Sequence, residues 1–159
     1  MTTFAVVKTR DDVAAFEVLT RALVGISLES LDVLDGQVSL PQFRLLLTLA
    51  GLGRVPSTKL AGELRQGASA VTRTVDRLAK AGLVERGTDE RNRSVVTLDV
   101  TERGRRLVTD VLDRRHEMLA AVLDRMSPEH HAAAVETAVE FCRNSDHVPA
   151  VGAAGPLPL

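Results

Sequence analysis

Apolar residues recur at helical spacing in the first third of the chain, and this pattern predicts two helices. The first covers residues 11–34 and the second covers about 41–52. Ser39 and Gln42 stand around a proline in the order of a capping box, which is typical of a helix start. The two apolar stripes are Val13, Phe16, Leu23, Ile26 and Leu34, and Phe43, Leu46, Leu47 and Ala50. We therefore expect two helices that pack on other helices through one face.

The next segment has the pattern of two short helices separated by a tight turn. The predicted helices cover about 58–65 and 68–81, with the turn at Gln66 and Gly67. One face of each helix is apolar, and Gly82 stands where the second helix should end. The apolar residues are Leu60, Ala61 and Leu64, and Val71, Val75 and Leu78. Two short helices joined by a turn that contains glycine indicate a helix-turn-helix.

Two β-prone runs follow the second short helix directly. They cover residues 83–86 and 94–98 and enclose the wholly polar segment 87–93. This order is typical of a β-hairpin with an exposed tip. A hairpin behind a helix-turn-helix is a wing, so about 57–100 is expected to form a winged helix-turn-helix.

Two further helices and a tail complete the pattern. The helices cover about 102–125, begun by Thr101, and about 128–145, capped by Ser127. The last helix is expected to bury Val135, Val139 and Cys142. Residues 149–159 are rich in Pro, Gly and Ala without periodicity, and they are predicted to be a flexible tail.

These elements predict a mainly α fold with a two-stranded β wing. The 159 residues, 45% of them hydrophobic, suit a single soluble domain, which we place at residues 1–148. The winged helix-turn-helix lies in the middle of that domain, and helices flank it on both sides.

Charge is distributed unevenly along the chain. The net charge is −1, but residues 54–106 carry 12 Lys and Arg against 7 Asp and Glu, whereas the rest carries 8 against 14. A basic middle between acidic ends indicates that one part of the chain meets phosphate. A solvated surface of uneven charge is the alternative. Aromatic residues are scarce, with four Phe and no Tyr or Trp. This scarcity disfavours the binding of single-stranded nucleic acid, in which bases stack on exposed rings.

Cysteine usage and hydropathy favour a cytoplasmic protein. The single cysteine, Cys142, cannot form an internal disulfide, and the N-terminus is too polar for a signal peptide. No stretch approaches the roughly 20 apolar residues of a membrane span, so we expect no membrane association. Cys142 is interpreted as a buried, inert thiol, with a redox sensor as the alternative.

The sequence has none of the common catalytic motifs. It contains no Gly-rich phosphate loop, no G-x-S-x-G and no H-E-x-x-H. His130 and His131, with His116 and nearby carboxylates, could suggest a metal site. Adjacent residues of a helix point about 100° apart, however, and chelate poorly. We therefore expect no enzyme, no metal and no cofactor, although a site pooled across a dimer stays open.

Taken in order, several segments of the chain resemble the MarR family of bacterial regulators. The segments are SLPQFRLLLTLA, STKLAGEL, SAVTRTVDRLAKAGLVER, DERNR and VTLDVTERGRRL. The resemblance covers about residues 11–145 and is most specific over 57–107. Three features depart from the family. Gln66 and Gly67 replace an apolar residue and a Ser-like cap, the wing tip lacks its last Arg, and no reactive Cys stands near the N-terminus.

The resemblance implies a homodimer that binds double-stranded DNA. The helices at about 11–34 and 102–145 would pair between subunits. They would set two recognition helices about one DNA turn apart on a pseudo-palindromic operator. The family also implies repression that is relieved by a small aromatic or phenolic effector, bound between the dimerisation helices and the DNA-binding lobe. Helices that pack only within their own domain are the alternative.

Candidate DNA-binding residues lie on the two short helices and the wing. The first turns of a recognition helix reach base edges, where Arg can fork onto guanine, and a wing Arg can enter the minor groove. The candidates are Ser57, Ser69, Thr72, Arg73, Arg77, Arg91 and Arg93. Arg77 is expected to reach phosphate or to pair with Asp76 or Glu63. The family resemblance gives Asp89 the role of holding Arg91 through an ion pair.

Two other classes of function compete with a DNA-binding regulator. One is a winged-helix module that only binds protein, which would be indifferent to mutation of Arg73 and Arg91. The other is a ligand-binding or catalytic protein that uses the fold without DNA. The concentration of basic residues on the predicted recognition helix and wing counts against both.

Overall fold

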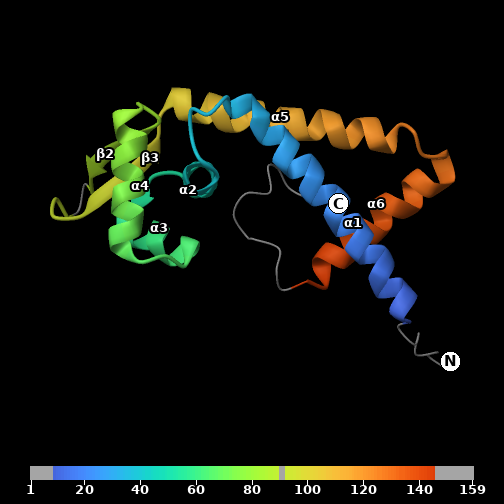
Figure 1. Ribbon diagram of the computed structural model, residues 1–159. Helices are drawn as coiled ribbons and strands as arrows, with labels where there is room; N and C mark the ends of the chain where they lie inside the picture. The colour runs from blue at the N-terminus through green and yellow to red at the C-terminus, as the bar shows by residue number, and fades with distance from the viewer. Residues whose placement is uncertain (1–8, 90–91, 146–159) are drawn as a thin grey trace.

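Helices form most of the chain that the computed structural model describes, which is residues 9–89 and 92–145. The α-helices are α1 (Arg10–Glu29), α2 (Leu40–Leu52), α3 (Ser57–Leu64), α4 (Ala68–Lys80), α5 (Glu102–Leu123) and α6 (Pro128–Arg143), and a 3₁₀ helix, η1 (Ser30–Leu34), follows α1. The strands are β1 (Val55–Pro56), β2 (Val84–Thr88) and β3 (Val96–Val100), in the antiparallel order β1-β3-β2. Figure 1 shows α3, α4 and the hairpin at one end of the molecule, α1 and α6 at the other, and α5 running between them.

The predicted mainly α fold with a β wing is confirmed, with one additional strand. Strand β1 pairs with β3 through Val55 and Leu98 and through Pro56 and Thr97. A two-residue strand that ends in proline is too short to show alternation, so the sequence pattern does not reveal it. The predicted tail at 149–159 lies outside the described residues.

The hydrophobic core lies in the winged-helix lobe. It is built from α2, α3, α4, the sheet and the first half of α5. The predicted face of the second short helix is confirmed, because Val71, Val75 and Leu78 are at most 2% exposed. Gly82 ends α4 as expected, with a φ of +70°. The amide of Leu83 donates to the carbonyl of Leu78, which is typical of a helix that ends in glycine.

The first helix is shorter than predicted. Its α-helical part ends at Glu29, and the chain continues as η1 before Asp35 and Gly36 turn with positive φ. The hydroxyl of the buried Ser30 donates to the carbonyl of Ser27 at 2.8 Å. A serine that bonds to the preceding turn competes with the regular α-helical pattern, which is consistent with a change of helix type here.

Helices α1 and α6 contain no buried residue, which overturns part of the predicted core. Val135 is 41% exposed, and Val139 and Cys142 are only half-buried. The rings of Phe16 and Phe141 stack with centroids 5.1 Å apart, so the two helices do meet. Each nevertheless has few neighbours within its own chain, and an apolar stripe alone cannot show which chain covers it. Much of the apolar surface of this end of the molecule is therefore open to solvent in one chain.

Capping boxes begin α1 and α2. The hydroxyl of Thr9 accepts from the amide of Asp12, and the amide of Thr9 donates to the Asp12 carboxylate at 2.7 Å. Hydrogen bonding of the Asp12 carboxylate by the backbone amide of Thr9, and secondarily by the Thr9 side chain, lowers the pKa of Asp12. The amide of Ser39 donates to Gln42 at 2.6 Å, as the capping-box pattern predicts.

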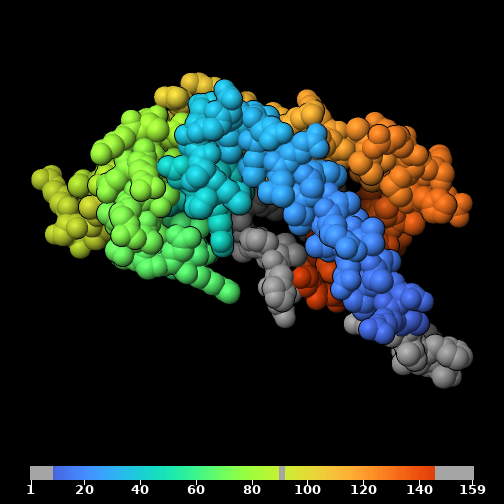
Figure 2. Space-filling model, in the orientation of Figure 1, coloured from blue at the N-terminus to red at the C-terminus, as the bar shows by residue number. Residues whose placement is uncertain are grey.

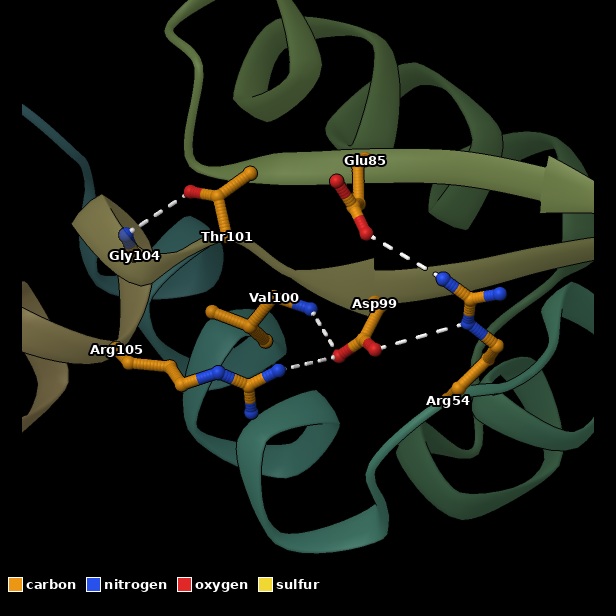
Figure 3. Close-up of polar contacts among 7 residues, drawn as sticks. All are labelled: Arg54, Glu85, Asp99, Val100, Thr101, Gly104 and Arg105. Atoms are coloured by element: carbon orange, nitrogen blue, oxygen red, sulfur yellow. Dashed lines mark hydrogen bonds and ion pairs between the residues drawn. The ribbon is translucent and has the colours of Figure 1, made fainter.

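The start of α5 is fastened to the corner between α4 and β2. The hydroxyl of Thr101 donates to the carbonyl of Gly82 at 2.7 Å and accepts from the amide of Gly104 at 3.1 Å, the second bond being drawn in Figure 3. The guanidinium of Arg103 donates to the carbonyl of Ala81 at 3.0 Å. The sequence predicts the cap, whereas the contacts to the end of α4 appear only in the structure.

Replacing Thr101 with alanine should lower the free energy of unfolding by about 1–2 kcal/mol, because one hydroxyl serves both as helix cap and as donor to another element. Replacing it with serine keeps that hydroxyl and should change stability by less than about 0.5 kcal/mol. Chemical denaturation of the two variants and the wild type at one protein concentration measures the difference. Equal losses in both variants would show that the methyl group of Thr101, and not its hydroxyl, stabilises this corner.

Candidate nucleic-acid interface

The turn between α3 and α4 differs in detail from the predicted one. The left-handed residue is Arg65, with a φ of 51°, while Gly67 is extended at φ −64° and ψ 141°. The amides of Ala70 and Val71 donate to the carbonyl of Gly67. The sequence places a glycine in this turn, but it does not show which residue takes the strained conformation.

The side of α4 away from its buried stripe carries the predicted recognition residues. Ser69, Thr72, Arg73 and Arg77 are all exposed there. The hydroxyl of Thr72 donates to the carbonyl of Ala68 at 2.9 Å. In this rotamer its oxygen can only accept a hydrogen bond. Thr72 therefore suits a base amino group better than a phosphate, which has only acceptors.

The first turn of α4 has no side-chain cap, because the N-cap residue is Gly67. The first amides of a helix have no acceptor within the helix, and they carry the positive end of its dipole. An exposed, uncapped helix start of this kind suits a phosphate group.

A hollow of about 160 Å³ lies between α3, α4 and the two strands of the wing. Its wall includes two of the predicted residues, Ser57 and Thr72, together with Arg86 and the exposed Val96. The structure thus brings Ser57, at the start of α3, to the same side of the lobe as the recognition helix.

The wing projects from the lobe beside α4, as the olive-yellow tip in Figure 2 shows. Strands β2 and β3 pair from Val84 with Val100 to Thr88 with Val96. Arg93 is exposed in the connection between them. Asp89 accepts a hydrogen bond from the amide of Asn92 at 3.0 Å. Arg91 lies outside the described residues, so its predicted pairing with Asp89 stays a prediction.

An ion pair that the sequence analysis missed joins the wing to the recognition helix. The guanidinium of Arg86 on β2 donates to the carboxylate of Asp76 on α4. Asp76 therefore has Arg86 as its partner and not Arg77, the partner considered above. Strand alternation places Arg86 on the same face of β2 as the buried Val84, but it does not show which carboxylate Arg86 meets.

A second set of charges holds the base of the wing to α5, as Figure 3 shows. Asp99 accepts from Arg105 on α5 at 2.9 Å and lies 3.7 Å from Arg54, which also pairs with Glu85 at 3.5 Å. The Asp99 side chain is 18% exposed, whereas the other three are about half exposed. The wing is thus tied to two helices through its two faces.

A second hollow lies between α1 and α5, in the region where the family resemblance places an effector. It is open, with a volume of about 520 Å³, and is lined by Ile26, Met118, Ala121 and Val122, by Glu117 and by two arginines, Arg114 and Arg125. One of these, Arg114, lies 3.8 Å from Glu29 and 3.5 Å from Glu117.

Neither a metal cluster nor a membrane-spanning helix is found within residues 9–89 and 92–145. No three His, Cys, Asp or Glu side chains are grouped there so as to hold a metal ion. No helix in these ranges combines the length and the apolar character needed to cross a bilayer.

Residues 38–96 match the model of the MarR family. The uncharacterized HTH-type transcriptional regulator YfiV of Bacillus subtilis is 29% identical over 99 residues, which are 62% of this chain and 62% of that protein. The crystal structure of RV1404 from Mycobacterium tuberculosis has a TM-score of 0.82 at 29% identity, covering 91% of this chain and 99% of that one. FabT of Streptococcus pneumoniae, crystallised in complex with DNA, has a TM-score of 0.64 at 22% identity, covering 84% and 94%.

Proposed function

We propose that this chain, whose residues 38–96 form a MarR family domain, binds a specific DNA duplex as a homodimer and thereby regulates transcription. One observation carries the proposal. The uncapped start of α4 and its exposed face, with Ser69, Thr72 and Arg73, lie beside a projecting wing that carries Arg93. A helix start of this kind suits phosphate, and the side chains of the next turns suit base edges.

The open apolar surface of α1 and α6 supports a homodimer. Exposed large apolar residues of these two helices include Val13, Leu19, Leu23, Val24, Val135 and Phe141. An apolar surface of this extent is expected to be covered by another chain, and two-fold pairing is the commonest way to cover it. A two-fold dimer would present two copies of α4 to successive turns of a pseudo-palindromic operator.

We further propose that the protein is a repressor whose effector is a small aromatic or phenolic molecule. The open hollow between α1 and α5 has apolar side chains for a ring and the guanidinium of Arg125 for a phenolate. Such a molecule releases DNA only to the extent that it binds the DNA-free arrangement more tightly than the DNA-bound one.

The test is fluorescence anisotropy with the duplex upstream of the gene for this chain, against a scrambled duplex of equal length. We expect nanomolar binding to the first duplex and much weaker binding to the second. The affinity should fall by about a thousandfold or more between roughly 50 and 200 mM salt, because several phosphates are contacted.

Sedimentation of the same samples reports whether the protein is a dimer. Equal, weak binding to both duplexes would place the specific site elsewhere, and a genome-wide selection of sites would then find it. A folded dimer that binds no duplex would contradict the proposal and favour a protein-interaction module.

A further inference from the structure

Asp76 and Arg86 connect the two elements that would enter different grooves of DNA. Asp76 lies on α4 and Arg86 on β2, and neighbouring Val75 and Val84 are each 2% exposed. The pair therefore stands at the edge of a packed contact between helix and strand. Its side chains are 48% and 43% exposed, so the ion pair itself is open to solvent.

The stability that such a pair contributes is small. Exposed ion pairs typically contribute between about 0 and 1 kcal/mol, because water and salt screen them and two side chains lose freedom. Breaking the pair should therefore leave the protein folded, so that a change in DNA binding can be read without a loss of stability.

The charge of Asp76 is also unfavourable for the proposed function. A carboxylate on a recognition helix repels DNA phosphates, and on charge alone its removal should strengthen binding. If Asp76 instead positions the wing, its removal should weaken binding. Measuring the DNA affinity of an Asp76 variant therefore distinguishes the two explanations.

We propose that Asp76 and Arg86 are positioning residues that hold the wing at a set angle to the recognition helix, so that both meet DNA together. The inference rests on the proposed function. Arg86 supplies the charge that neutralises Asp76 and draws the base of the wing toward α4. With the pair broken, the wing samples other angles, and part of the binding energy is lost in ordering it on DNA.

The test compares Asp76→Ala, Arg86→Gln and the double variant with wild type on the operator duplex. Glu63→Ala is the matched control, because Glu63 is an exposed carboxylate on α3 of the same lobe. We expect Asp76→Ala to bind about five- to tenfold more weakly than wild type, although it has lost a negative charge. Glu63→Ala should bind as tightly as wild type or more tightly. The double variant should bind as weakly as Arg86→Gln alone, without a further loss or a recovery of affinity, because the two residues act as a unit.

Amide hydrogen exchange of the free protein provides a second measurement that does not depend on DNA. Asp76→Ala should speed exchange of the amides of β2 and β3 near the tip and leave those of α2 unchanged. Unchanged exchange in the wing would overturn the inference whatever DNA the protein binds.

Two binding results would also overturn it. One is an Asp76→Ala variant that binds the operator as tightly as wild type or more tightly. The other is a double variant that recovers the affinity lost in Arg86→Gln, since independent charges would add. If wild type binds no duplex while the wing exchange responds as expected, the proposed function fails and the mechanical link between wing and helix stands.

Discussion

Replacing Arg73 with alanine should weaken operator binding by about 100-fold or more. Arg73 is exposed near the start of α4, where a recognition helix meets base edges. A guanidinium that forks onto a guanine contributes about 1–3 kcal/mol of discrimination, and a two-fold dimer makes that contact twice. Anisotropy titrations with operator and scrambled duplex should show the loss mainly on the operator.

The control for Arg73→Ala is Lys80→Ala. Lys80 is exposed on the last turn of the same helix, so this variant loses the same charge from the other end of α4. It should lower affinity only a few-fold, and on both duplexes alike. Arg73→Lys keeps the charge without the fork and should recover little of the specificity. Equal losses in the Arg73 and Lys80 variants would mean that the helix attracts DNA by charge alone.

Replacing Gly104 with alanine should lower the free energy of unfolding by about 2–3 kcal/mol. A Cβ on Gly104 would lie 2.7 Å from Cγ1 of Val100 and closer still to the carbonyl oxygen of Leu83. That carbonyl is held in place, because it accepts the amide of Thr101 at 3.1 Å. The carbonyl oxygen of Leu83 cannot shift away from the new Cβ unless β2 or α5 also moves. The melting temperature should fall by about 4–12 °C at fixed protein concentration.

Gly62→Ala is the matched control for this prediction. Gly62 lies within α3, and a Cβ there meets no atom within 4 Å. Alanine should stabilise that helix by about 0.5–1 kcal/mol, because it is the better helix former. A Gly104 variant as stable as the Gly62 variant would show that the corner can relax.

Predictions from the sequence succeed where neighbouring residues in the chain determine whether a side chain is buried or caps a helix. Val71 and Val75 are buried because the helical period places them on one face, and Thr101 caps α5 because its hydroxyl lies next to the orphan amides. The wing is found because a polar segment separates two β-prone runs. These are local patterns, and they suffice to indicate both the fold and the face of α4 that carries the candidate site.

The features that the sequence does not reveal depend on residues far apart or on another surface. The pairing of Asp76 with Arg86 joins two elements, whereas the sequence alone offers the neighbouring Arg77 as a partner for Asp76. The expected burial of Val135 fails within one chain, since an apolar stripe is the same whether its own chain or a second copy covers it. The left-handed turn falls on Arg65 although a glycine stands two residues later.

The fastening of α5 to the end of α4 also has a mechanical consequence. With 22 residues, α5 is about 33 Å long, and its start is fastened to residues 81–83, directly after the recognition helix, through Thr101, Arg103 and Gly104. It therefore behaves as a rigid rod whose start cannot move independently of the corner between α4 and β2. A tilt of about 10° around the fastened corner displaces the far end of α5 by roughly 6 Å. Conversely, a rigid α5 displaced by that amount at its far end would turn the corner that follows the recognition helix by a comparable angle.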